Sequence, residues 1–103
     1  MIARVLRVDV EPRLIDAVVA TYRNSVRPIH QAANGLRQHY VLVDRQVGRI
    51  EIIGIWESAE ALADVAPILE PARKRLWAQF SREPQLAVYD VADELRYRPT
   101  STT

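Results

Sequence analysis

Two apolar runs separated by a short polar connection constrain this chain more than any other feature. Residues 36–43 and 49–56 flank the sequence Asp44-Arg45-Gln46-Val47-Gly48. A connection of roughly three to five residues that contains glycine is typical of a β-hairpin, because glycine readily adopts a positive φ. The pattern predicts two antiparallel strands joined by this turn, with Gly48 in the left-handed region.

The pairing across this turn decides which side chains share a face of the sheet. We expect Val43 to lie opposite Arg49. The face predicted to meet the helices then carries Leu36, Gln38, Tyr40, Leu42, Ile50, Ile52, Gly54 and Trp56. The other face carries His39, Val41, Val43, Glu51, Ile53 and Ile55. Because side chains alternate along a strand, a shift of one residue would exchange the two faces.

The segment before the hairpin predicts one strand and one helix. Residues 2–10 alternate and are rich in Val, as in a strand. Pro12 suits the first turn of a helix, and an apolar stripe follows it. The stripe consists of Leu14, Val18, Tyr22, Val26 and Ile29. Pro28 is expected to kink or end this helix, which leaves residues 29–34 as a turn or a short irregular helix.

The segment after the hairpin predicts two helical pieces and a last strand. Ser58 suits a helix N-cap, and the helix that it opens is expected to stop or bend at Pro67. A second helical piece is expected from Pro71, and residues 86–92 are typical of a strand. The resulting order, β-α-β-β-α-β, predicts an α+β ferredoxin-like fold, a four-stranded antiparallel sheet with the helices on one face.

Composition places the chain among ordinary globular domains. Its 103 residues suit a single domain, expected over residues 1–95, with residues 96–103 as a disordered tail. A formal net charge of +1 indicates neither a nucleic-acid nor a membrane partner. The chain has no cysteine and no apolar run long enough to cross a bilayer, so we expect a cytoplasmic protein.

Large apolar residues on both faces of the hairpin predict a homodimer. Two helices can cover one face of a four-stranded sheet, and nothing else in the sequence is expected to cover the other. An exposed apolar patch of that size is unusual in a monomer. We therefore expect a second copy to cover it, which gives a dimeric α/β barrel. The predicted interface residues are His39, Val41, Glu51, Ile53 and Ile55.

Three groups of residues resemble the antibiotic biosynthesis monooxygenase domain of the dimeric α/β-barrel superfamily. They are Asn34-Gly35-Leu36, Tyr40-Val41-Leu42-Val43-Asp44 with Gly48, and Trp56-Glu57-Ser58-Ala59-Glu60-Ala61-Leu62. The likeness covers approximately the first 92 residues and includes Pro84 and Val88-Tyr89-Asp90-Val91. It implies the predicted fold and dimer. The family includes cofactor-independent quinone-forming oxygenases and haem-degrading enzymes.

The site residues known from two branches of this family are only partly present in this sequence. Trp56 matches a pocket Trp of the quinone-forming branch, whose Asn and Tyr positions hold Ile52 and Leu62 here. The polar and aromatic positions of the haem-degrading branch fall near Leu6, Val65 and Arg75. The resemblance therefore implies no haem, and we expect no cofactor.

A hollow beneath the helices is expected around Gly54, because a missing side chain in mid-strand leaves room. The predicted catalytic residues are Trp56 and Tyr40, and the predicted substrate-binding residues are Gln38, Gly54, Tyr22, Arg4 and Trp77. The alternative, slightly favoured, is that Gly54 admits a bulky helix residue such as Tyr22 or Phe80. The indole N–H of a buried Trp56 needs an acceptor, which Gln38 could supply.

The histidines and Arg4 leave alternatives open. His39 is expected beside Glu51, either as a general base or as half of an interfacial ion pair, and the ion pair is favoured. His30 is expected at the surface, and two histidines without an acidic cluster predict no metal site. Arg4, on the helix side of the first strand, would bind an anionic substrate group or pair with a helix carboxylate.

Two hypotheses of function follow from these observations. The first is a small homodimeric oxygenase that deprotonates a phenol or quinol, whose electron-rich ring then reacts with oxygen without a cofactor. The second is a ligand-binding or structural dimeric α/β barrel without catalysis.

Overall fold

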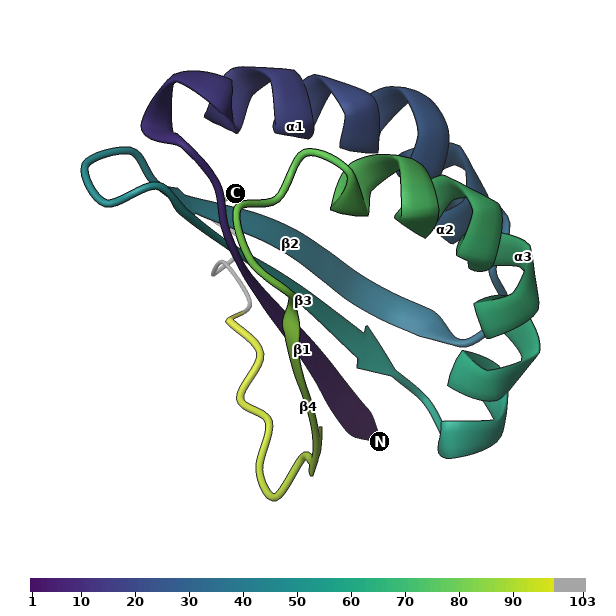
Figure 1. Ribbon diagram of the computed structural model, residues 1–103. Coiled ribbons are helices and arrows are strands. Elements are labelled where there is room, and N and C mark those ends of the chain that lie inside the picture. Colours follow the sequence, from purple (N-terminus) through teal and green to yellow (C-terminus); the bar gives the residue numbers. More distant parts are fainter. Residues whose placement is uncertain (98–103) are drawn as a thin grey trace, which may run out of the picture.

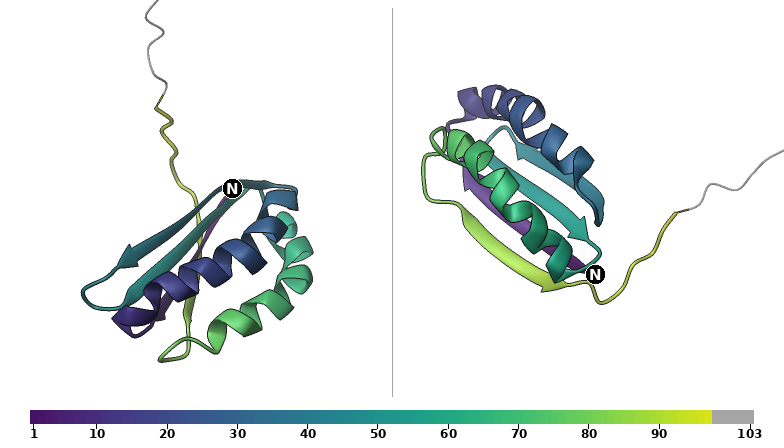
Figure 2. Two further views of the ribbon diagram at one scale, coloured as in Figure 1. Left: turned by 90° about the horizontal axis from the view of Figure 1, so that it is seen from above. Right: turned by 90° about the vertical axis from the view of Figure 1, so that its right-hand side faces the viewer.

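The computed structural model describes residues 1–97, and its elements follow the predicted order (Figure 1). The strands are β1 (Ile2–Asp9), β2 (Leu36–Asp44), β3 (Arg49–Trp56) and β4 (Gln85–Asp90). They form one antiparallel sheet in the order β2-β3-β1-β4. The helices lie on one face of this sheet (Figure 2), which confirms the ferredoxin-like α+β fold. Of the predicted tail, residues 98–103 lie outside the described residues.

The first helical region runs without a break through four elements. These are η1 (Pro12–Leu14), α1 (Ile15–Thr21), the π-helical turn η2 (Tyr22–Val26) and α2 (Arg27–Ala32). Pro28 was expected to kink or end the helix, and the helix does not end there, because Pro28 occupies one of the first two positions of α2, directly after the π-helical turn. Proline lacks an amide hydrogen and crowds the carbonyl group four residues earlier, so the helix widens before it instead of ending.

Helix α3 (Ala59–Trp77) is also continuous, although two pieces were predicted. Ser58 caps it, since its Oγ accepts a hydrogen bond from the amide of Ala61 at 3.1 Å. Pro67 and Pro71 lie inside the helix and are exposed. Because they are one turn apart, the carbonyl groups that lose an amide partner face water on one side, and α3 curves over the sheet (Figure 1). Packing of the opposite side keeps it helical.

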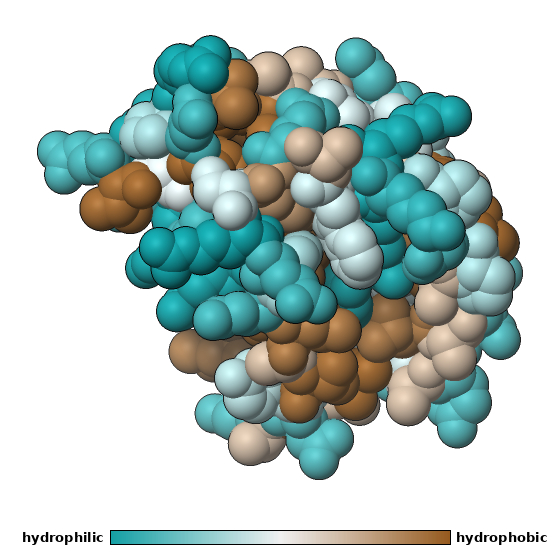
Figure 3. Space-filling model, viewed as in Figure 1, coloured by the Kyte–Doolittle hydropathy of each residue, from teal (hydrophilic) through white to brown (hydrophobic). Residues whose placement is uncertain are grey.

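The core lies between the helices and one face of the sheet. From the sheet it contains Leu6, Val8, Val10, Ile50, Ile52 and Trp56. From the helices it contains Ile15, Val18, Tyr22, Val26, Val65, Leu69, Ala72 and Leu76. The helices leave the β4 edge uncovered, where Leu86 and Val88 are exposed. Hydrophobic side chains accordingly gather on the lower part of the surface in Figure 3, below a band of hydrophilic residues.

The hairpin register differs by one residue from the predicted one. Asp44, rather than Val43, pairs with Arg49. The side chain of Asp44 accepts hydrogen bonds from the amides of Gln46 and Val47, at 3.0 and 3.3 Å. This shortens the connection to the four residues 45–48, in which Gly48 has the predicted positive φ, at 77°.

From Gln38 to Val43 the shifted register exchanges the two faces of β2 relative to the prediction, whereas an irregularity between Leu36 and Gln38 leaves Leu36 paired with Trp56 as predicted. His39 now pairs with Gly54 and Val41 with Ile52, so both side chains lie beneath the helices and not at a dimer interface. Conversely, Gln38 and Tyr40 lie on the outer face, away from the predicted hollow. The faces predicted for β3 are confirmed, since Ile50, Ile52, Gly54 and Trp56 are buried.

Among the described residues, no helix is both long enough and apolar enough to cross a membrane.

Candidate functional site

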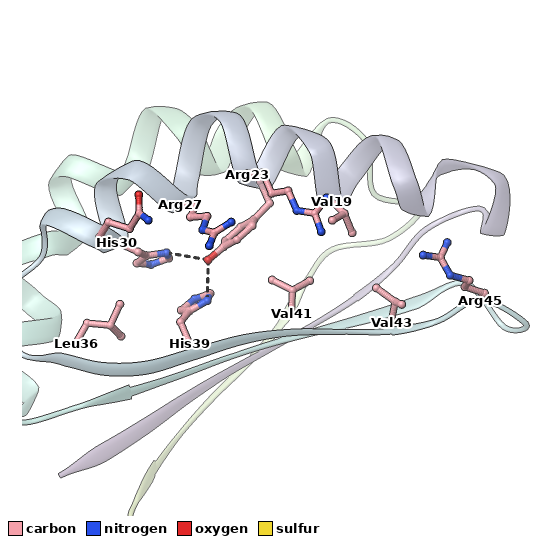
Figure 4. A pocket seen from close by; sticks show the side chains of 11 residues that line it. Val19, Arg23, Arg27, His30, Leu36, His39, Val41, Val43 and Arg45 are labelled. Carbon is pink, nitrogen blue, oxygen red and sulfur yellow. Dashed lines mark hydrogen bonds between the residues drawn. The ribbon is translucent and has the colours of Figure 1, made fainter.

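A cleft of about 430 Å³ lies between the first helical region and strand β2 (Figure 4). Its helix side consists of Val19, Tyr22, Arg23, Arg27, His30 and Gln31. Its sheet side consists of Leu36, His39, Val41 and Val43, and Arg45 lines it from the turn. Clefts of roughly 300–1,000 Å³ with a few convergent polar groups are typical of small-molecule sites. No Asp or Glu of the described residues lines this one.

One tyrosine joins two histidines at the inner end of the cleft. The hydroxyl group of Tyr22 lies 2.7 Å from Nδ1 of His39 and 3.4 Å from Nδ1 of His30. The ring of His39 stacks on Tyr22, and the centroids of the two histidine rings are 4.2 Å apart. Strand β2 supplies His39, whereas η2 and α2 supply the other two residues. The π turn therefore brings a helix and a strand together at one hydroxyl group.

A single hydroxyl group between two Nδ1 atoms can hold the two rings in opposite tautomers. It can donate a hydrogen bond to one ring and accept one from the other. Whichever ring donates from Nδ1 has an unprotonated Nε2, which can accept a proton. The cluster therefore contains one ring that is ready to act as a base while both rings remain neutral.

Burial keeps both histidines neutral. Burial, followed by the charges of His39, Arg73 and Arg4, lowers the pKa of His30 to about 3. Burial and Arg4 lower the pKa of His39 to about 4. Burial raises the pKa of Tyr22 to about 12, against the smaller opposing influence of Arg27. At neutral pH the cluster is uncharged and surrounded by arginines.

These shifts predict that the native state loses stability in mild acid. The folded-state pKa values of His30 and His39 lie below the unfolded value of about 6.5, so the unfolded chain takes up protons first. Below pH 6.5 the free energy of unfolding should fall by at most about 1.4 kcal/mol per pH unit for each histidine. The loss should be smaller for His39, which solvent partly screens.

Urea unfolding at pH 7, 6 and 5 measures this loss. The variant His30→Gln should show a shallower dependence than the wild type, because one of the two titrating groups is removed. Equal dependence in the two proteins would contradict the buried, neutral state of His30.

The sequence is similar to two uncharacterized proteins of Mycobacterium tuberculosis, Rv2558 and Rv2557. They are 30% and 31% identical to it over 90 residues. The match covers 87% of this chain but only 38% and 40% of theirs, so the chain spans less than half the length of these relatives. No protein-family model matches the sequence.

The fold is similar to several solved oxygenases. A monooxygenase from the Streptomyces coelicolor gene ActVA-Orf6, in complex with nanaomycin D, has a TM-score of 0.81 at 14% identity, covering 94% of this chain and 92% of that one. SnoaB, a cofactor-independent oxygenase from Streptomyces nogalater, has a TM-score of 0.72 at 19% identity, and the match covers 93% of this chain and 97% of SnoaB. The crystal structure of an antibiotic biosynthesis monooxygenase has a TM-score of 0.75 at 18% identity, and the match covers 90% of this chain and 100% of that one. This chain has the antibiotic biosynthesis monooxygenase fold.

In this antibiotic biosynthesis monooxygenase fold, the space left by Gly54 is filled from the chain itself. A Cβ atom at Gly54 would lie 2.9 Å from Nε1 of Trp56 and 3.4 Å from Cδ2 of His39. Trp56 is only 1% exposed and belongs to the core, and its ring lies in a tilted, edge-type contact with the ring of His30, with 6.1 Å between centroids. The predicted alternative was a bulky helix residue such as Tyr22 or Phe80, whereas the side chains nearest to Gly54 come from two strands, Trp56 of β3 and His39 of β2.

The structure brings together only some of the residues predicted to form the site. Tyr22 lines the open cleft, and Arg4 and Trp77 line a small void behind it. Gln38 and Tyr40 lie on the outer face of the sheet, where Oη of Tyr40 is 3.4 Å from Oε1 of Gln38. Gln38 therefore cannot accept the predicted hydrogen bond from the indole N–H of Trp56. Glu51 pairs with Arg7 at 2.8 Å and not with His39.

The prediction missed His30 as a site residue and placed it at the surface. In the structure it is 9% exposed and touches Tyr22. The signal was present, because Tyr22, Val26 and His30 recur every four residues on one helical stripe. Because residues 29–34 were expected to form a turn or a short irregular helix, His30 was not included in this stripe. Nothing in the sequence pattern singled out Arg23 and Arg27 at the mouth of the cleft.

Proposed function

We propose that this chain is a cofactor-independent oxygenase and that its cleft binds a phenol or quinol-type aromatic compound. The observation that carries the proposal is the neutral His39, hydrogen-bonded through Nδ1 to Tyr22, in a cleft that no Asp or Glu of residues 1–97 lines. The volume of about 430 Å³ suits an aromatic compound of modest size.

The proposed first step is the transfer of the phenolic proton to Nε2 of His39. In this step Nδ1–H of His39 donates to Tyr22, whose hydroxyl group donates to His30. The pKa of about 4 keeps His39 free of a proton beforehand. Transfer creates a phenolate beside the ring, and a negative neighbour favours the imidazolium. Arg23 and Arg27 at the mouth of the cleft stabilise the phenolate in the same way.

The phenolate is then electron-rich enough to react with oxygen. In the overall reaction one atom of O₂ becomes a ring carbonyl group, which converts the phenol to a quinone. The other atom leaves as water, with the phenolic hydrogen and the hydrogen of the attacked ring carbon. The chain's part in this scheme is to bind the ring, remove the proton and hold the anion.

Two similar structures support the proposal. SnoaB is described as a cofactor-independent oxygenase, and the ActVA-Orf6 monooxygenase is described with nanaomycin D bound. At their identities the likeness concerns the fold, so the chemistry proposed here depends on the cleft of this chain.

Oxygen uptake with a panel of phenols and hydroquinones tests the function. We expect uptake above the uncatalysed rate for at least one compound, and formation of the corresponding quinone. Tyr40→Phe should keep this activity, because Tyr40 lies on the outer face. Uptake at the uncatalysed rate across the whole panel would overturn the proposal and favour a non-catalytic binding protein.

We also propose that a second copy of the chain covers the outer face of the sheet. Two rows of mostly apolar residues cross all four strands there. One row is Tyr40, Ile53, Val5 and Ala87, and the next is Gln38, Ile55, Ala3 and Tyr89. Tyr40 and Tyr89 are 51% and 59% exposed. A self-complementary apolar face of this kind suits an isologous dimer, with Glu51, Ile53 and Ile55 inside it.

Ile53→Lys is expected to dissociate this dimer, because it places a charge in the middle of the apolar rows. Sedimentation at micromolar concentration should give a dimer for the wild type and a monomer for the variant. Ile68→Lys, which changes an isoleucine of α3 that is 61% exposed, should remain a dimer. A monomeric wild type would contradict the proposal.

A further inference from the structure

Arg4 of β1 and Arg73 of α3 are two partly buried guanidinium groups beneath the helices. Neither takes part in a salt bridge among residues 1–97. The residues directly opposite Arg4 are Gly54 on β3 and Val88 on β4, and neither is acidic. The acidic group that acts on Arg73 is Glu70, which is exposed on the same helix. Arg4 therefore has no salt-bridge partner among residues 1–97, and Arg73 is compensated only by the exposed Glu70.

Two small voids lie behind His30, and both are lined by Arg4, Arg73 and His30. Their volumes are about 10 and 20 Å³. His39 and Trp56 also line the first void, whereas the second is otherwise lined by Tyr22 and apolar residues. The voids also share Ile52, so they adjoin, and together they exceed the roughly 10–15 Å³ that one water-sized group needs. No Asp or Glu of the described residues lines either void.

The charges around these voids have one sign. Burial, and then the charge of Arg73, lowers the pKa of Arg4 to about 10, so it stays charged at neutral pH. Both arginines also lower the pKa of His30. Like charges held together away from water destabilise the native state, and a bound anion removes that cost.

We propose that Arg4 and Arg73 form a subsite for a small monovalent anion, of the size of chloride or of a carboxylate group. The guanidinium fork matches two carboxylate oxygens, and a halide can accept from the same donors. The anion is either free in solution or the carboxylate of an aromatic substrate, and the second source rests on the proposed function.

Thermal unfolding in increasing sodium formate tests the subsite without any turnover. The ionic strength is held constant with a bulky sulfonate, which the voids cannot admit. An anion that binds only the native state raises the melting temperature. We expect formate to stabilise the wild type and Arg75→Met, which changes an exposed arginine of the same helix. The apparent affinity for formate should be roughly tenfold weaker or more in Arg4→Met and Arg73→Met.

In sulfonate alone, Arg4→Met should be at least as stable as the wild type, because it removes an uncompensated charge. Should Arg4→Met fail to fold, Arg4→Lys keeps the charge without the fork and should bind formate more weakly than the wild type. Equal stabilisation of the wild type and the folded Arg4 variant by formate would overturn the subsite.

Calorimetry with 4-hydroxybenzoate and with phenol separates the two sources of the anion. Binding of 4-hydroxybenzoate that depends on Arg4 and displaces formate assigns the site to a substrate carboxylate, and binding of formate alone assigns it to a free anion. Either result supports the subsite. If formate binds and no phenol is oxidised, the subsite stands and the proposed oxygenase function fails.

Discussion

Replacing His39 with asparagine is expected to lower oxygen uptake with a phenol substrate by about 10²–10⁴-fold, the range typical of a lost general base. The amide of asparagine can still donate to Tyr22 from the place of Nδ1, so the hydrogen bond of 2.7 Å has a substitute. Asparagine has no basic nitrogen at the position of Nε2, so it cannot take up the phenolic proton. The variant should therefore fold and bind while failing in the proton transfer.

The comparison with two tyrosine variants makes this prediction specific. Tyr22→Phe removes the hydroxyl group that joins the two histidines and should lower the rate, whereas Tyr40→Phe removes one from the outer face and should leave it unchanged. Stopped-flow rates at saturating substrate report the chemical step. A rate for His39→Asn within threefold of the wild-type rate would contradict the role of His39.

Trp56→Ala is expected to destabilise the native state by about 3–5 kcal/mol, as large-to-small changes at a buried Trp do. Trp56 is 1% exposed and is the largest of the fully buried side chains. It packs at the end of β3, and its ring edge lies near Gly54 and His30. The surrounding strands restrict collapse into the space, so most of the cavity should remain. A loss of this size is a large fraction of the total stability of a small domain.

Guanidinium unfolding measures this loss as a lower midpoint with an unchanged slope. Trp77→Ala is the matched control, because Trp77 is 42% exposed at the end of α3 and should cost much less. Equal midpoints for the two variants would show that Trp56 is not the centre of the core.

The fold followed from the sequence because its strongest signals are local. The alternating residues of the hairpin, Gly48 and the Ser58 cap each depend on neighbours within a few positions, and the structure confirms them. The effects of Pro28 and Pro67 were predicted only in part. Pro28 was expected to kink or end its helix and Pro67 to stop or bend the next one, but the tertiary packing of Val26, His30 and Leu69 holds both helices together through these prolines.

The site was predicted less well because the positions of its side chains change when the pairing of β2 with β3 shifts by one residue. The side chain of Asp44 caps the turn and draws Asp44 into the strand. That single step moves His39 from the outer face to the cleft and Tyr40 in the reverse direction. Arg4 was correctly placed on the helix side, but its neighbour Arg73 comes from a distant helix, so the sequence could not indicate the pair.

In the proposed mechanism, His30 and His39 are neutral rings of opposite tautomer joined through the hydroxyl group of Tyr22. Long-range ¹H–¹⁵N correlation spectra of the histidine side chains, recorded between pH 5 and 8, measure the protonation of each ring nitrogen directly. We predict that neither ring titrates in this range, and that His39 carries its proton on Nδ1 while His30 carries its proton on Nε2. A ring that titrates near pH 6.5, or a proton on Nε2 of His39, would contradict the account.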